Sequence, residues 1–221
     1  MKISILMMED HMSEFLEGSM KNFLVELSSK NAVPGGGGAS AYAAALGMAL
    51  GSMVANLTTG KKKYAEYQEE IDQILAGVDS ITDELASYIK KDAEAFEPLS
   101  KAYGMKADTD EEKKAKDEVM GKVLCDATKT PLGLMETTLE SMKVLERLSF
   151  IGSKMAISDV GVGIQMAKAG LNGASLNVFI NTKAMKDRNM ADEFNFEADK
   201  MLAEGNKLAD DIYERVCDQL R

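Results

Sequence analysis

Asp92 is the side chain with the clearest potential for chemistry, because it is the one charged residue in a stripe of apolar positions. The stripe runs from Tyr64 to Leu99 in alternating steps of three and four residues, which is the spacing of a single helix face. A carboxylate on a buried face must find a polar partner or raise its pKa until it holds a proton. Asp92 is therefore a candidate general acid or base. The alternative is a structural aspartate bonded to a lysine or to a helix terminus.

Four consecutive glycines stand directly before a long run of alanine and glycine, and three consecutive lysines follow that run. The amides at the start of a helix can contact an anionic or carbonyl-bearing ligand, and the lysines can attract a carboxylate. The structural alternatives are a flexible turn and solvated lysines that complement the helix dipole. The candidate binding residues of these two segments are Pro34, Gly35, Gly36, Gly37, Gly38, Lys61, Lys62 and Lys63.

A second group of polar residues lies in the glycine-rich stretch that begins at Ser158. Asp159 is a second candidate carboxylate, although Ser158 and Asp159 are also ordinary helix caps. Asn177 and Asn181 are four residues apart, so a helix presents both on one face. Their amides can hydrogen-bond a heterocyclic ligand or, equally well, the backbone of a neighbouring helix.

The composition excludes several classes of function. His11 is the only histidine, which rules out zinc sites built on several histidines and a Ser-His-Asp triad, so we expect no metal. Cys125 and Cys217 are far apart in the sequence, and we expect reduced thiols in a cytoplasmic protein. A formal charge of -10 opposes binding to nucleic acid or to anionic membranes. Catalysis would have to depend on carboxylates, lysines, hydroxyls or the backbone.

The elements that must position these residues are helices. Helical periodicity extends over nearly the whole chain, and the alternation typical of strands is almost absent. We expect residues 1–221 to form a single all-α domain, a bundle of about six to eight helices around a buried helix rich in glycine and alanine. The uncharged stretch 35–60 lacks the large apolar residues of a typical membrane span, so it predicts that buried helix. The other predicted helices are 12–27, 64–99, 109 to about 129, 131–148, one from 158, and one through 194–216.

Three ordered motifs give the chain a family resemblance. They are FLVELSSKNAVPGGGGASAYAAALGMALGSMVANLTTGKKKY, DAEAF and SDVGVGIQMAKAGLNGASLNVFIN. Together they resemble the cyclodeaminase/cyclohydrolase family, which includes the C-terminal half of formiminotransferase-cyclodeaminase and stand-alone methenyltetrahydrofolate cyclohydrolases. The resemblance covers nearly the whole chain. It departs from the family pattern at Gly163 and Gln165, where alanine or an aliphatic residue is expected.

The resemblance implies an all-helical homodimer that holds a one-carbon tetrahydrofolate derivative near the glycine-rich segment, with no further cofactor. It implies that Asp92 transfers a proton, that Asp159 supports or orients the substrate, and that Lys61 to Lys63 attract the glutamate tail of a folate, expected to be polyglutamylated. Because this chain has no formiminotransferase domain, methenyltetrahydrofolate cyclohydrolase is the favoured activity. Formimidoyltetrahydrofolate cyclodeaminase is the close alternative, and a non-catalytic folate-binding or scaffold module is an alternative of another class.

Overall fold

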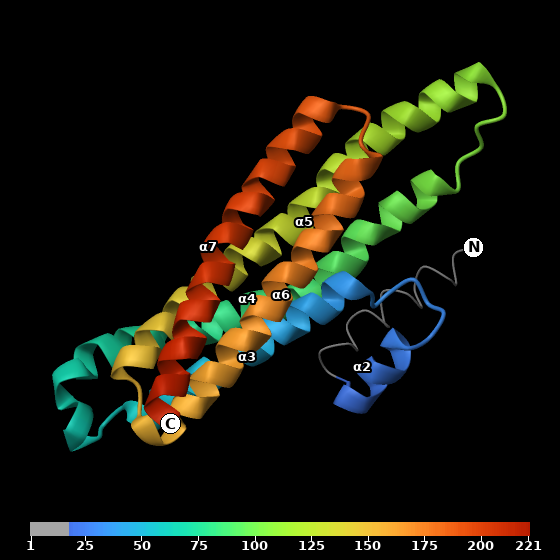
Figure 1. Ribbon diagram of the computed structural model, residues 1–221. Helices are drawn as coiled ribbons and strands as arrows, with labels where there is room; N and C mark the ends of the chain where they lie inside the picture. Colours follow the sequence, from blue (N-terminus) through green and yellow to red (C-terminus); the bar gives the residue numbers. More distant parts are fainter. Residues whose placement is uncertain (1–17) are drawn as a thin grey trace.

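The computed structural model describes residues 18–221, and their secondary structure consists of helices and connecting turns (Figure 1). This confirms the all-α prediction. The predicted helix over 12–27 ends as expected at Leu27, but α2 begins only at Met20, because Ser19 is its N-cap. Met12, Phe15 and Leu16 lie outside the described residues. The elements are α2 (Met20–Leu27), α3 (Gly36–Thr58), the 3₁₀ helix η1 (Lys62–Tyr67), α4 (Gln68–Tyr103), α5 (Asp110–Ile151), the 3₁₀ helix η2 (Lys154–Ala156), α6 (Ile157–Ala184) and α7 (Arg188–Leu220).

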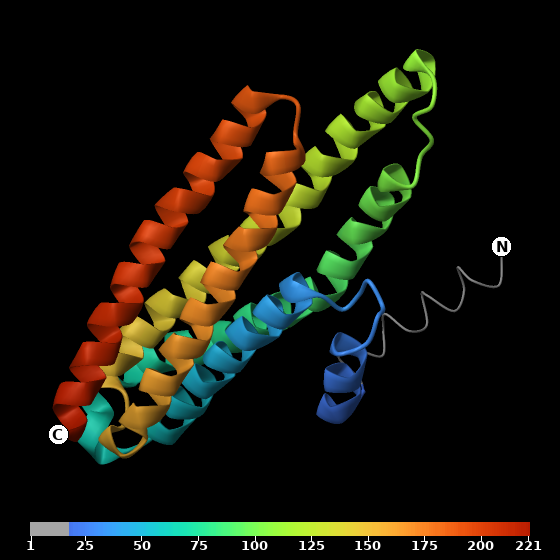
Figure 2. The same cartoon turned by 45° about the vertical axis from the view of Figure 1, so that its right-hand side comes forward.

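The five long helices lie alongside one another as an elongated bundle (Figures 1 and 2). Helix α3 packs against α4, α5 and α6, and residues such as Ala41, Ala44 and Met48 on its inner face are fully buried. By length and composition alone, α3 could cross a membrane, but 56% of its most apolar window is buried against the other helices. This burial favours a helix of the protein core over a membrane span.

Glycines let the backbones of α3 and α6 touch. A Cβ at Gly47 would lie 2.6 Å from the carbonyl oxygen of Gly163, and a Cβ at Gly170 would lie 2.8 Å from that of Ser40. Gly163, one of the two departures from the family pattern, thus stands at the closest part of this contact. Its lack of a side chain is what permits that approach.

Helix α5 corrects one prediction from the sequence. Its start is as expected, because Thr109 and Glu112 form a capping box. The predicted end near Lys129 and new start at Pro131 are wrong, since α5 continues through Pro131 to Ile151. A proline in a helix costs about 3 kcal/mol, but the buried residues on both sides of it, such as Leu124 and Met135, hold the two halves in one helix.

Candidate active site

Asp92 projects from α4 onto the first turn of α3. Its carboxylate oxygen Oδ2 accepts a hydrogen bond from the backbone N–H of Gly38 at 3.0 Å. The N-cap of α3 is Gly35, which has no side chain to satisfy the free amides of that turn, so a residue of another helix does so. A Cβ at Gly37 would lie 2.0 Å from Oδ1 of Asp92. The glycine segment therefore permits the carboxylate to reach the helix terminus.

The environment of Asp92 favours its protonated form. Burial raises the pKa of the carboxyl above its ordinary value, and the hydrogen bond from Gly38 acts in the opposite direction. Among residues 18–221, no lysine or arginine forms an ion pair with Asp92. The bond to a helix terminus was the structural alternative for this residue. The structure shows that bond, and the raised pKa leaves the same carboxyl a candidate for proton exchange.

Asp92 lies in the wall of a cavity of 220 Å³ between α4, α5 and α6. Asn177 and Asn181 lie in the same wall, so the structure brings together three of the residues selected from the sequence. The side-chain amide of Asn177 also donates to the carbonyl oxygen of Gly173 at 3.2 Å. Apolar and aromatic side chains form most of the remaining wall, which suits a flat heterocycle with polar edges. The lining residues are Asp92, Ala95, Phe96, Leu99, Tyr103, Ala127, Pro131, Asn177, Ile180 and Asn181.

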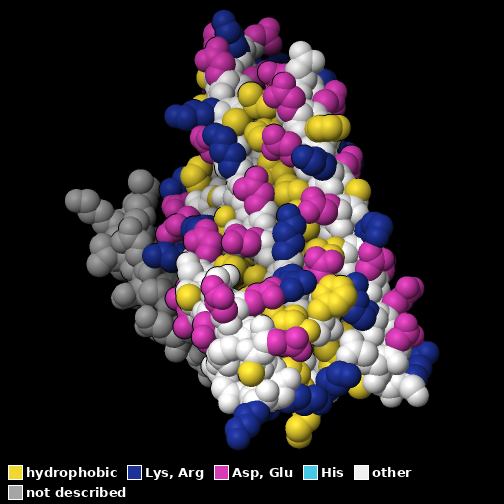
Figure 3. Space-filling view, turned by 90° about the vertical axis from the view of Figure 1, so that its left-hand side faces the viewer, with side chains coloured by type: hydrophobic (Ala, Val, Ile, Leu, Met, Phe, Trp, Pro, Cys, Tyr) yellow, Lys and Arg dark blue, Asp and Glu magenta, His cyan; other side chains and the backbone are white. Residues whose placement is uncertain are grey.

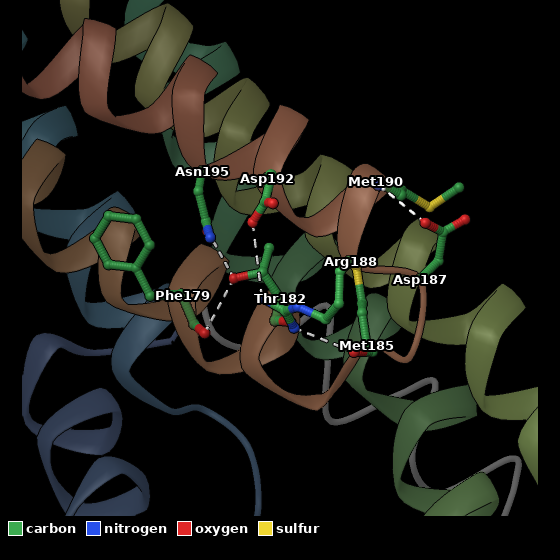
Figure 4. Close-up of polar contacts among 8 residues, drawn as sticks. All are labelled: Phe179, Thr182, Met185, Asp187, Arg188, Met190, Asp192 and Asn195. Carbon is green, nitrogen blue, oxygen red and sulfur yellow. Dashed lines mark hydrogen bonds and ion pairs between the residues drawn. The ribbon is translucent and has the colours of Figure 1, made fainter.

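The α6–α7 connection holds the end of α6 that carries the two asparagines (Figure 4). The Thr182 hydroxyl donates to Asn195 Oδ1 at 2.7 Å, which ties α6 to α7. The guanidinium of Arg188 donates to the carbonyl oxygens of Thr182 and Met185 at 2.9 and 3.2 Å. These bonds satisfy carbonyls that a helix end leaves free. They fix this end of α6 relative to α7 and to the connection between the two helices.

The structure does not bring Asp159 to this cavity. Asp159 is in the first turn of α6, 18 residues before Asn177 in the same helix, which is about 27 Å along the helix axis. The N-terminal end of α6 lies instead near the C-terminal end of α3. There the N–H of Ser153, which precedes η2 and α6, donates to Thr58 Oγ1 at 2.8 Å. The interpretation that Asp92 and Asp159 serve one site therefore does not hold within one subunit.

Lys61, Lys62 and Lys63 are exposed at the same distant end. They follow the 23 residues of α3, so about 34 Å of helix separates them from its glycine-rich start. Of the glycine segment, Gly37 and Gly38 meet Asp92 directly. Pro34, Gly35 and Gly36 lead into that turn, and none of the five residues 34–38 is among those that line the cavity.

A larger hollow, of 460 Å³, lies between α5 and α7. Four glutamates and two lysines dominate its wall, and Lys143 pairs with Glu204 at 3.0 Å. Figure 3 shows the side of the molecule on which α7 lies, where acidic and basic side chains alternate with exposed apolar ones. Within the described part of the chain, none of the candidate residues lies in the wall of this larger hollow. We therefore assign the chemistry to the smaller cavity at Asp92.

Comparisons with known proteins place the chain in a family. Residues 19–200 match the family model described as formiminotransferase-cyclodeaminase. A methenyltetrahydrofolate cyclohydrolase of Methylorubrum extorquens is 40% identical over 198 residues, which cover 90% of this chain and 95% of that protein.

The chain belongs to the formiminotransferase-cyclodeaminase family.

Two further proteins are similar to this chain: one is a longer protein, and the other has a known crystal structure. The formimidoyltransferase-cyclodeaminase of Mus musculus is 31% identical over 172 residues, and the match covers 78% of this chain but only 32% of the mouse protein. The crystal structure of a formiminotetrahydrofolate cyclodeaminase from Thermotoga maritima superposes with a TM-score of 0.75 at 28% identity. It covers 91% of this chain and 95% of that one. The family resemblance drawn from the three motifs is thus confirmed.

Several residues of this family member's cavity were missed in the sequence. Phe96 follows Asp92 by four residues in the DAEAF motif, so helix spacing could have placed both on one face. Ile180 could have been found in the same way beside Asn177. The shared face of Ala127 and Pro131 is not visible in the sequence, because a proline favours the start of a new helix and the two residues are then predicted to lie in different helices.

Proposed function

We propose that this protein is a methenyltetrahydrofolate cyclohydrolase, which hydrolyses 5,10-methenyltetrahydrofolate reversibly to 10-formyltetrahydrofolate. The observation that carries the proposal is the Asp92 carboxyl, protonated more readily than usual, in the wall of a cavity with two asparagine amides. The 40% identity to the Methylorubrum extorquens cyclohydrolase over nearly its whole length supports the choice of reaction.

The reaction needs protons moved at two places. The methenyl carbon is electrophilic because its amidinium-like bridge shares a positive charge between N5 and N10. The oxygen of a water molecule bonds to this carbon, and the bond from carbon to N5 breaks with its electron pair going to N5. Of the two protons of the water, one ends on N5 and the other is released. The carbon is left as a formyl group on N10.

Asp92 is the group proposed to move these protons. As a carboxylate it takes a proton from the attacking water, and as an acid it returns one to the departing N5. Burial raises the pKa of this carboxyl, which makes its acid form easier to reach than in an exposed aspartate. General acid–base catalysis of this kind contributes a factor of about 100 to 10,000. Asn177 and Asn181 orient the heterocycle by hydrogen bonds to its polar edge.

The second candidate is formimidoyltetrahydrofolate cyclodeaminase. The likeness to the Thermotoga maritima cyclodeaminase favours it. In that reaction N10 bonds to the formimino carbon and loses its hydrogen as a proton. The imino nitrogen gains two protons, its bond to that carbon breaks, and it leaves as ammonia. The same carboxyl would take the proton from N10 and pass it to the departing nitrogen, and the second proton comes from solvent.

The test is to assay the purified protein with both substrates. Methenyl absorbance should disappear faster than in buffer when 5,10-methenyltetrahydrofolate is supplied, and 10-formyltetrahydrofolate should form. Asp92→Asn serves as the inactive control. Release of ammonia from 5-formiminotetrahydrofolate without accelerated methenyl hydrolysis would select the cyclodeaminase. Folate binding without turnover of either substrate would leave a binding module and refute both enzymes.

The active form is proposed to be a homodimer, because α3 and α6 together present one exposed apolar face. The exposed fractions on this face reach 66% for Leu176 and Ile180, and a second copy would remove these side chains from water. The exposed residues of this face are Leu46, Met53, Leu57, Val162, Met166, Leu176 and Ile180. Light scattering should give about 48 kDa, twice the 24.0 kDa of one chain. Leu176→Glu should shift the mass toward one chain, and a wild-type mass of one chain would reject the dimer.

The dimer also gives Lys61 to Lys63 a role in the proposal. Antiparallel pairing of the two faces keeps the two lysine clusters apart and sets the lysines of one subunit beside the Asp92 cavity of the other. There they would attract the tail of a polyglutamylated folate. Replacing the three lysines by glutamine should raise KM more for a polyglutamylated than for a monoglutamylated substrate. An equal effect on both substrates would remove the lysines from tail binding.

The cytoplasm is the proposed location, and both cysteines are free thiols.

A further inference from the structure

Pro131 leaves one backbone carbonyl of α5 without its usual donor. In an α-helix the N–H of each residue bonds the carbonyl oxygen four residues earlier. Proline has no N–H, so residue 131 cannot donate to the carbonyl of Ala127. The proline ring also crowds that carbonyl and tilts it away from the helix axis.

The residue that carries this carbonyl lines the Asp92 cavity. Ala127 and Pro131 are one helix turn apart on the same face of α5, and both line the cavity. In a helix the carbonyl of one residue faces the residue four positions later, so the unfilled hydrogen-bond position here lies between two residues of the cavity wall. Ala127 is only 6% exposed, which means that bulk water has little access to this oxygen in the folded chain.

We propose that the Ala127 carbonyl accepts a hydrogen bond from an N–H group of the bound heterocycle, with Pro131 as the positioning residue that keeps this oxygen available. The inference rests on the proposed function, since the pyrimidine edge of a tetrahydrofolate carries an amide N–H and an amino group. Such donors need acceptors when the ligand leaves water for the cavity, and a buried acceptor favours a ligand that satisfies it.

A second proline provides an internal comparison. Pro98 also lies inside a helix, α4, and it removes the usual donor to the carbonyl of Glu94. Both Pro98 and Glu94 are exposed, and neither is part of the cavity wall among residues 18–221. Of the two helical prolines, Pro131 is therefore the one whose freed carbonyl belongs to a residue of the cavity wall.

The experiment compares Pro131→Val, Pro131→Ala and Pro98→Ala. Valine has the same number of side-chain carbons as proline but restores the N–H, whereas alanine restores the N–H and also empties space in the wall. Affinity is measured by calorimetric titration with tetrahydrofolate, and stability by thermal melting. Both Pro131 variants should lose about tenfold in affinity, the loss expected for one hydrogen bond. They should melt no lower than the wild type, because α5 gains a helix hydrogen bond. Pro98→Ala should bind as the wild type does.

Several results would overturn the inference. Weak binding by Pro131→Ala together with normal binding by Pro131→Val would make the effect one of cavity shape. Normal binding by both, or weak binding that accompanies a lower melting temperature in both, would equally remove the carbonyl from recognition. A wild type that binds tetrahydrofolate but hydrolyses no methenyl substrate refutes the proposed function alone, and the affinities of the variants still decide the inference. A wild type that does not bind overturns both.

Discussion

Replacing Asp92 by asparagine separates the chemistry of this residue from its structural bond. Asparagine has the same shape as aspartate, and its Oδ1 can still accept the N–H of Gly38, which is 3.0 Å from the native carboxylate. It cannot take up and release a proton near neutral pH. If Asp92 transfers protons, turnover should fall by at least about 100-fold while folate affinity changes little.

The effect on stability follows from the direction of the pKa shift. Burial raises the pKa of Asp92 in the folded state above its ordinary value of 3.8. Between the unfolded and the folded pKa the folded chain holds more protons than the unfolded chain, so the free energy of unfolding falls as pH rises through that window. Above the folded pKa, the folded chain carries the full free-energy cost of a buried, ionised carboxylate. Asparagine carries no charge and avoids this cost, so Asp92→Asn should melt no lower than the wild type at pH 7. Well below pH 3.8 its advantage should disappear.

The assay combines thermal melting across pH with steady-state kinetics on methenyltetrahydrofolate. Glu70→Gln is the matched control, because Glu70 pairs with Arg147 at 2.6 Å and its pKa is lowered rather than raised. That variant should lose a little stability at pH 7 and keep its activity. Near-normal turnover by Asp92→Asn would remove Asp92 from the mechanism. A marked loss of melting temperature at pH 7 would show that the carboxylate is a structural anion, contrary to the environment described above.

Three further outcomes are expected. Gly37→Ala should displace Asp92 and reduce turnover strongly, since the new Cβ would lie 2.0 Å from the carboxylate. Gly36→Ala should leave turnover unchanged, because its new Cβ meets no atom within 4 Å. Comparing the kcat values of the two variants tests this. Gly47→Ala should destabilise the α3–α6 contact by about 1–3 kcal/mol, and Gly77→Ala, in open space on α4, should be neutral or stabilising in the same urea titration. Full activity should survive EDTA and dialysis, because the proposed chemistry uses a carboxylate and amides; activity restored by one added divalent ion would contradict this.

Local sequence features were sufficient to predict most of the helices and to select the leading catalytic candidate. A helix forms its hydrogen bonds within one segment, so apolar spacing, caps and breaks reveal it without knowledge of its neighbours. The capping box at Thr109 is an example, since its two partners are three residues apart. Asp92 stood out for the same reason: one charged residue in an apolar stripe is visible from periodicity alone.

Contacts between helices could not be read in this way. Whether Pro131 ends a helix depends on buried residues on both sides that press α5 against its neighbours, and this packing outweighed a local penalty. Asp92 and Gly38 are 54 residues apart in sequence, and only the crossing of α4 and α3 makes them partners. The antiparallel course of α3 and α6 likewise set Asn177 beside Asp92 and carried Asp159 to the other end of the bundle. Sequence supplied the reactive groups because their chemistry is local, and tertiary structure chose which of them meet because packing joins residues distant along the chain.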